Sequence, residues 1–289
     1  MSDKHVDETT GVTTTGHVWD GIRELDNPMP RWWLWTFYAT ILFSIGYMVY
    51  YPAIPLWNSS TMGISGQTNR MQLKRDLEAV EVSRRDTIAK LAASKLSEIQ
   101  GNEQLVRFAV AGGASLFKVY CSQCHGSGAQ GAPGYPNLND DDWLWGGDID
   151  AIYTSIAHGV RNEEDADSRY SEMPAFGADG ILERSEISAA TEYVLKLSGQ
   201  EHDAALASQG AQVFADNCAA CHADDGTGDR EQGAPNLADA ISLYGNTRET
   251  IHAQIHRPKH GVMPSWSVRM REANLKQLAL YVHSLGGGE

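Results

Sequence analysis

Two short segments carry all four cysteines of the chain, and each pair of cysteines is followed at once by a histidine. They run from Cys121 to His125 and from Cys218 to His222, and both read C-x-x-C-H. This is the attachment signature of c-type haem. The two thiols form thioethers to one porphyrin, and the histidine lies under the iron as its proximal ligand. The motifs therefore predict two covalently bound haem c groups, one held by Cys121, Cys124 and His125 and the other by Cys218, Cys221 and His222.

Other uses of a cysteine pair are less consistent with the surrounding sequence. A thioredoxin-type redox pair would lie at the mouth of a βαβ unit, but no strand-like run rich in valine and isoleucine precedes either motif. Structural zinc would need a fourth ligand at finger-like spacing beside the two cysteines and the histidine, and the sequence offers none. Zinc and a disulfide stay open as the alternatives to haem.

Each half of the sequence also offers a methionine for the sixth position of an iron. Met173 and Met263 lie at comparable distances after His125 and His222, and each is followed by a proline that stiffens the loop. A protein ligand in this position makes the iron an electron carrier, whereas an open position would let it bind oxygen or peroxide. A lone methionine is more often core packing, but the repetition in register predicts both as iron ligands. Histidine ligation at one haem is the alternative, from His158, His252, His256 or His260.

Two further pairs of residues are candidates for the haem surroundings. The carbonyls of Pro136 and Pro235 are expected to accept a hydrogen bond from Nδ1–H of the proximal histidines, which would fix the orientation of each ring. Trp145 and Tyr244 are interpreted either as donors to a haem propionate or as packing against the porphyrin edge.

The elements that must position these residues occur twice after residue 100. Each copy has a helix leading into the haem motif, a Pro-Asn-Leu loop, a Met-Pro pair and a closing helix, predicted over residues 185–198 and 271–285. The chain is therefore predicted to contain two small helical domains, at residues 104–200 and 201–289. The recurring segments are Gly113–Phe117 and Gly210–Phe214, Pro136–Leu138 and Pro235–Leu237, and Met173–Pro174 and Met263–Pro264.

An apolar run near the N-terminus is long enough to cross a membrane. No charged residue occurs between Arg31 and Arg70. A helix from Trp33 to Tyr51, at ~1.5 Å per residue, spans roughly 28 Å, close to the hydrocarbon thickness of a bilayer. Tryptophans and tyrosines at its two ends are typical of interfacial belts. We expect residues 32–54 to form one transmembrane helix, rather than a buried helix of a soluble protein, after an N-terminal segment at 1–31 that lacks the features of a signal peptide.

Residues 55–103 are predicted to link this helix to the haem domains. Apolar residues at helical spacings, with charged residues between them, predict an amphipathic helix over residues 70–100. It could lie on a partner subunit or on the membrane surface, or it could be a spacer that packs on the haem domains.

The formal net charge of −14 is concentrated in the two haem repeats. An acidic surface argues against binding nucleic acid, which needs basic faces. It suits the steering of a basic protein such as a lysine-rich cytochrome, for which Asp140, Asp141 and Asp142 form a candidate docking site, or it simply keeps the protein soluble. No phosphate-binding glycine loop or Ser/His/Asp set is present, so the chemistry is expected from the cofactor.

Each repeat resembles class I c-type cytochromes, in which a helix leads into C-x-x-C-H, a Pro-Asn-Leu loop follows, and a methionine ligand precedes the last helix. The segment from Trp19 to Trp33, which runs into a single membrane helix, narrows this resemblance. It is similar to the dihaem subunit III, or CcoP/FixP family, of cbb3-type cytochrome c oxidase, and the similarity spans essentially the whole chain.

This resemblance implies an all-α protein with one transmembrane helix, a linker helix and two tandem cytochrome c domains. It implies a subunit in the bacterial inner membrane, with the N-terminus cytoplasmic and the haem domains periplasmic, where c-type haem is attached. His125 with Met173, and His222 with Met263, would be the axial pairs. Electrons would pass from a donor cytochrome to the monohaem subunit and then to the catalytic haem-copper subunit, which reduces O2 and translocates protons; this chain would not bind O2.

Two other functions stay open. One is a dihaem carrier serving another membrane dehydrogenase, against which the Trp19–Trp33 segment argues. The other is a dihaem peroxidase, which requires an iron with a displaceable ligand, and the matched Met-Pro pairs argue against that.

Overall fold

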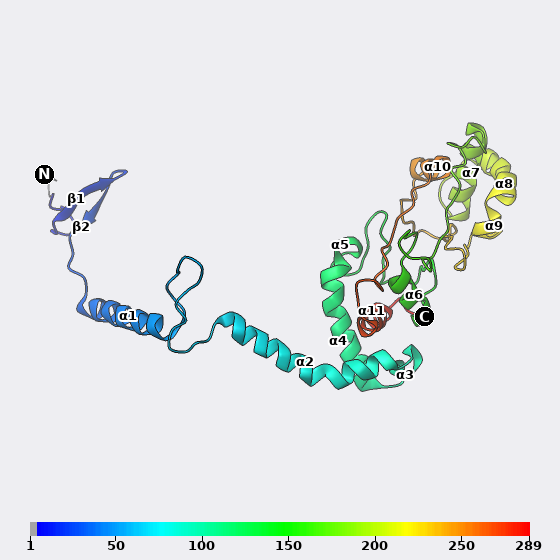
Figure 1. Ribbon diagram of the computed structural model, residues 1–289. Helices are drawn as coiled ribbons and strands as arrows, with labels where there is room; N and C mark the ends of the chain where they lie inside the picture. The colour runs from blue at the N-terminus through cyan, green and yellow to red at the C-terminus, as the bar shows by residue number, and fades with distance from the viewer. Residues whose placement is uncertain (1–4) are drawn as a thin grey trace. The chain divides into compact units, whose positions relative to one another are not determined.

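The computed structural model describes residues 5–289 and divides the chain after Ser83 into two compact units (Figure 1). The first unit begins with an antiparallel hairpin of β1 (Thr14–Trp19) and β2 (Ile22–Leu25). Its turn is made by Asp20 and Gly21, both with positive φ, which Asp-Gly pairs adopt readily in two-residue hairpins. An all-α protein was predicted from the sequence, so the hairpin adds a small β element to a mostly helical protein.

Helix α1 (Arg31–Tyr50) forms the expected apolar helix. Pro30 stands at its N-cap, where a missing N–H costs nothing, and the helix ends before Pro52. None of its residues is buried in the structure, although the helix is long and apolar enough to span a membrane. A helix with an exposed apolar surface on all sides requires a covering of lipid or protein.

The expected linker helix consists of two helices. Helix α2 (Asn69–Ala93) is followed by a break at Ser94 and by the short α3 (Leu96–Gln100). The end of α2 and α3 contribute Leu91, Leu96 and Ile99 to a buried cluster with residues of α4 and α11. The C-terminal part of the linker therefore packs on the haem domains, as expected for a spacer. The start of α2 is exposed.

The second unit contains the two predicted copies of a small helical domain. In the first copy, α4 leads into the haem motif on α5, and α6 and α7 follow; in the second, α8 leads into α9, and α10 and α11 follow. Asn102, Asp148, Asp203 and Thr247 cap the N-termini of α4, α6, α8 and α10 with side-chain hydrogen bonds. The helices are α4 (Glu103–Tyr120), α5 (Ser122–His125), α6 (Ile149–His158), α7 (Arg184–Leu197), α8 (Ala204–Asn217), α9 (Ala219–His222), α10 (Arg248–His256) and α11 (Glu272–His283).

The closing helices are exchanged between the two copies. Helix α11, which ends the second repeat, packs on α4 and α6 of the first, and α7, which ends the first repeat, packs on α8 and α10 of the second (Figure 1). Each crossing is close because a glycine stands at the contact. A Cβ on Gly113 would lie 2.1 Å from the Gln277 carbonyl oxygen, and one on Gly210 would lie 2.0 Å from that of Ala189.

Equivalent aromatic pairs fill the two crossings. The rings of Phe117 and Tyr281 lie 5.4 Å apart, and those of Phe214 and Tyr193 lie 5.2 Å apart. Both phenylalanines are almost fully buried. The two sequence repeats thus have the expected elements, but each folded haem domain combines the first part of one repeat with the closing helix of the other.

An ion pair between the buried Glu192 and the half-exposed Arg248 stabilises the second of these domains. The Glu192 carboxylate on α7 accepts hydrogen bonds from Nε and Nη2 of Arg248, at the start of α10, at 2.5 and 3.2 Å. It also accepts the backbone N–H of Asp203, the N-cap of α8, at 2.7 Å. Glu192 is only 5% exposed. A buried carboxylate needs such complete satisfaction, and here one side chain ties together three helices from both repeats.

Candidate haem sites

One helical turn presents the two thiols and the imidazole of each motif. Helix α4 ends at Cys121, whose carbonyl accepts the backbone N–H groups of Cys124 and His125 at 3.1 and 3.0 Å. The second motif repeats this turn, with the Cys218 carbonyl accepting from Cys221 and His222 at 3.1 and 2.9 Å. The spacing of the motif therefore places both sulfurs and the ring on one compact turn.

Each proximal histidine is oriented by the predicted proline carbonyl. Nδ1 of His125 lies 3.0 Å from the Pro136 oxygen, and Nδ1 of His222 lies 3.0 Å from the Pro235 oxygen. The carbonyl is only an acceptor, so Nδ1 carries the proton and Nε2 is left as the metal ligand. Burial lowers the pKa of both imidazoles, although the proline carbonyls act in the opposite direction. A neutral ring is the form that binds iron.

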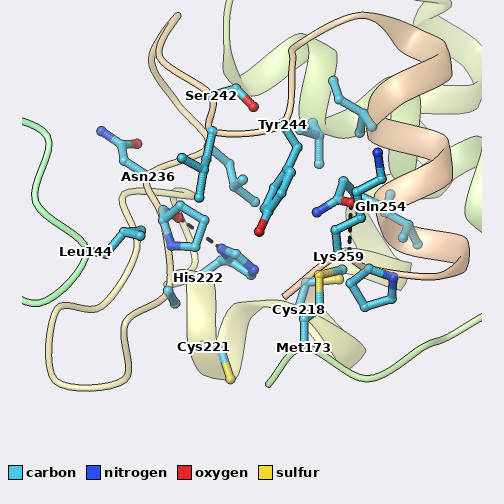
Figure 2. A pocket seen from close by; sticks show the side chains of 18 of the residues that line it. Leu144, Met173, Cys218, Cys221, His222, Asn236, Ser242, Tyr244, Gln254 and Lys259 are labelled. Carbon is cyan, nitrogen blue, oxygen red and sulfur yellow. Dashed lines mark hydrogen bonds between the residues drawn. The ribbon is translucent and has the colours of Figure 1, made fainter. Parts of the chain in front are cut away.

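A cavity lies against each motif. The first has a volume of about 440 Å³ and is lined by Cys121, Cys124, His125 and Met263 together with apolar residues of α4, α6 and α11. The second has a volume of about 230 Å³ and is lined by Cys218, Cys221, His222 and Met173 (Figure 2). The walls of both are mainly apolar, as a porphyrin requires.

The structure groups the methionines and histidines differently from the axial pairs that the family resemblance implied. Met263 shares a cavity with His125, and Met173 shares a cavity with His222. The physical reason is the exchange of the closing segments, because each methionine immediately precedes the segment that crosses to the other repeat. Backbone hydrogen bonds hold this arrangement: Val160, just after α6, exchanges N–H and carbonyl bonds with Met263, both at 3.0 Å.

The surroundings of the four cysteines fit haem c better than zinc. All four are free thiols. Burial raises the pKa of Cys121 and Cys218 to about 11, with a smaller effect from the second cysteine of each motif. An apolar cavity bordered by two thiols and an oriented imidazole suits a covalently attached porphyrin. Among the described residues, the one cluster of side chains spaced for a metal ion contains no cysteine: His158, Asp165 and Asp167.

The two cavities share a wall. Leu144, Trp145, Leu243 and Tyr244 line both of them. Each aromatic ring lies against a glycine of the opposite repeat, so a Cβ on Gly233 would lie 2.3 Å from Trp145 and one on Gly134 would lie 3.4 Å from Tyr244. Trp145 and Tyr244 therefore separate the two haem sites, a role between repeats that the sequence analysis did not foresee.

Two further residues that line both cavities were missed from the sequence: Arg161 and Lys259. They follow the ends of α6 and α10, and nothing in their spacing distinguishes them from surface loop residues. Only the exchange of segments brings them to the shared wall.

The histidines considered as alternative ligands have other roles. His158 Nδ1 lies 3.2 Å from a carboxylate oxygen of Asp165, and His256 packs where a Cβ on Gly177 would stand. His252 lines neither cavity. His260 lines both, but its Nε2 accepts the backbone N–H of Met173 at 3.1 Å. The geometry therefore favours methionine at both sites.

Two families match the sequence. Residues 11–58 match the N-terminal domain of cytochrome oxidase-cbb3, FixP. Residues 108–194 and 205–282 each match the family of cytochrome c oxidase, cbb3-type, subunit III. The two matches to the second family coincide with the two repeats.

Relatives of known identity align over nearly the full chain. The sequence is 55% identical to the cbb3-type cytochrome c oxidase subunit CcoP of Cereibacter sphaeroides, over 96% of this chain and 95% of the relative. It is 52% identical to the subunit FixPc of Rhizobium leguminosarum bv. viciae and 53% identical to FixP of Rhizobium meliloti, over the full length of both chains in each case.

Proposed function

The chain belongs to the CcoP/FixP family of cbb3-type cytochrome c oxidase subunits, and we propose that it relays electrons from a periplasmic donor cytochrome into that oxidase through two haem c sites. The observation that carries the proposal is the pair of cavities, each bordered by two cysteines, an oriented histidine and a methionine, with one wall in common. When bound, haem c supplies a reversible one-electron iron couple. The protein holds and orients the group and closes its sixth position.

The site residues follow from the cavities. Cys121 and Cys124 would form the thioethers of the first haem, and Cys218 and Cys221 those of the second. His125 with Met263, and His222 with Met173, would be the axial pairs. A methionine at each iron favours the ferrous state and excludes O2 or peroxide from the sixth position. This argues against the peroxidase alternative and leaves O2 reduction to the catalytic haem-copper subunit.

The anchor and its orientation complete the proposal. Helix α1 would span the bacterial inner membrane once, since no residue of it is buried within the protein. The N-terminus would be cytoplasmic and the haem domains periplasmic, where thioethers to haem are formed. From there the electrons would reach the monohaem subunit and then the catalytic subunit.

The N-terminal hairpin is proposed to dock on the membrane helices of the catalytic subunit. Val18, Trp19 and Ile22 are more than half exposed around the two-residue turn at Asp20 and Gly21. Replacing Trp19, Asp20 and Gly21 together by alanine should lower the recovery of assembled oxidase, measured as b-type haem that copurifies with the chain. Unchanged recovery would exclude this docking role.

The function is tested by purifying the complex through this chain in a mild detergent. We expect b-type haem to copurify with two haem c per chain and with cyanide-sensitive oxygen uptake. Two haem c without b-type haem, in a preparation cross-linked before solubilisation, would instead support a carrier for another enzyme. Reduced chain that binds CO rapidly at either haem would revive the peroxidase alternative.

A further inference from the structure

Arg161 occupies a strained position between the two haem sites. It is one of four described residues other than glycine with positive φ, at 53°. This conformation is unfavourable for a residue with a Cβ, so its neighbours must hold it there. The preceding residue, Val160, is bonded on both sides to Met263, and the N–H of Arg161 donates to the Arg169 carbonyl at 2.7 Å. The backbone of Arg161 is therefore fixed beside one ligand loop.

The guanidinium joins this loop to the other one. Its Nε donates to the carbonyl of Gly261 at 2.7 Å, and its Nη1 donates to the carbonyl of Ser171 at 3.0 Å. Gly261 stands two residues before Met263, and Ser171 stands two residues before Met173. One planar fork thus binds the same position of both ligand loops, which a lysine ammonium could not reproduce with the same geometry.

The same two loops are in contact a second time. The backbone N–H of Met173 donates to Nε2 of His260, which belongs to the segment that carries Met263. The methionine loops therefore form one hydrogen-bonded assembly, with Arg161 as the member that contacts both of them through its side chain.

The charge of Arg161 lies between the two cavities, since its side chain lines both. Within residues 5–289 no carboxylate lies at ion-pair distance from it, and its guanidinium donates to the carbonyls of Gly261 and Ser171. Burial lowers the pKa of this guanidinium, opposed by Tyr244 and Glu172, but an arginine stays charged in proteins. A fixed positive charge opposes the gain of charge when either iron is oxidised, so it raises both reduction potentials.

We propose that Arg161 is a positioning residue shared by both haem sites: its guanidinium clamps the two methionine loops together, so that one side chain presents the sixth ligand to both irons. The inference rests on the proposed function, in which Met173 and Met263 are those ligands. An arginine with only a local structural role would affect one site, whereas a substitution of Arg161 should loosen both Met173 and Met263, which lie in different cavities.

The test compares Arg161→Gln and Arg161→Lys with wild type in the purified full-length holoprotein. Two full-length backgrounds, C121A/C124A and C218A/C221A, each retain one haem and report on one site. In both backgrounds Arg161→Gln should weaken the charge-transfer band of methionine-ligated ferric haem, lower the midpoint potential and raise CO binding by the ferrous form severalfold. Arg161→Lys keeps the charge without the fork, so it should restore part of the potential but not the band.

Arg169→Gln is the matched control. Arg169 is also a half-buried arginine at this wall, lying over Trp145 and donating to the Ala151 carbonyl, but it bonds to neither methionine loop through its side chain. Its replacement should leave both bands in place. If Arg161→Gln weakened the methionine band at only one haem, or if Arg161→Lys showed the full band, the proposal that Arg161 clamps both loops would be wrong. A wild-type protein without the methionine band would instead refute the proposed ligation itself.

Discussion

Met173 and Met263 each follow the haem motif of their own repeat in sequence but line the cavity of the other motif. The choice between the two pairings is made by the packing of the closing helices and not by the loops themselves, which are alike in both repeats. The pairing can be tested directly because each haem can be removed by itself.

With only the second haem attached, in a C121A/C124A chain, Met173→Ala should abolish the methionine band and lower the midpoint potential of that haem. Met263→Ala should leave both unchanged, because it belongs to the other cavity. In a C218A/C221A chain the effects of the two substitutions should be reversed. Visible spectroscopy and redox titration measure both quantities. The opposite pattern would restore the pairing within each repeat.

Asp142 gives the protein a pH dependence near the first cavity. Burial raises the pKa of its carboxyl to about 6, and the charges of Asp239 and Asp140 act in the same direction. Because the unfolded chain has a value near 3.8, the folded protein binds more protons between about pH 4 and pH 6, and its stability falls as the pH rises through that interval. Asp142→Asn should remove this contribution to the loss of stability with rising pH, as measured by Tm across pH 4–7. An unchanged profile would contradict the assignment.

Most of the individual site residues could be predicted from the sequence. The cysteines and histidines are defined by a five-residue spacing, and the proline carbonyls by their position after it. Arg161 was not readable, because its partners Ser171 and Gly261 come from two different repeats and no local pattern relates them.

Among the elements, the crossing of α4 and α11 is the contact that fixes the first haem domain. Gly113→Ala would place a methyl group within 2.1 Å of a backbone oxygen of α11, which cannot move without the helix. We expect a loss of about 2 kcal/mol from this overpacking, and a Tm lower by roughly 4–8 °C.

Gly112→Ala is the control on the same helix. Its Cβ would meet only the side-chain end of Gln277, at 2.5 Å, and that amide can turn away. Alanine is the better helix former by about 1 kcal/mol, so Tm should stay constant or rise. Equal destabilisation by the two substitutions, measured by thermal unfolding, would show that the close crossing is not what matters.

The elements themselves were predicted with unequal success, for local reasons. The helices before each haem motif have strong apolar periodicity, and α1 is uniformly apolar. The hairpin has an Asp-Gly turn signal at Asp20 and Gly21, but its strands are short and polar. The break at Ser94 has neither proline nor glycine, so one continuous helix was the simpler prediction. The exchange of α7 and α11 has no signal in either repeat, because each helix packs an equivalent tyrosine, Tyr193 or Tyr281, against the phenylalanine of its partner.

For the whole molecule, the exchange makes the two haem domains dependent on each other. A chain that ends after Gln200 keeps the first haem motif and Met173 but lacks α11 and Met263. Its ferrous haem should bind CO readily, whereas the full-length C218A/C221A chain should not. Equilibrium CO titration followed by visible spectroscopy measures this difference. A truncated chain with an intact methionine band would show that the first repeat closes on its own.

The exchange also sets an order of events during biogenesis. If helix α1 spans the membrane as proposed, the first haem motif crosses before the second, yet Met263, which lines the cavity of that motif, lies more than a hundred positions downstream. The first haem motif to cross the membrane would therefore be the last to have its cavity completed, by Met263 and α11. Incomplete chains that lack α11 also lack Met263 and the part of the first cavity wall that this helix supplies, so the same feature that joins the two finished domains leaves a truncated chain with an open apolar cavity.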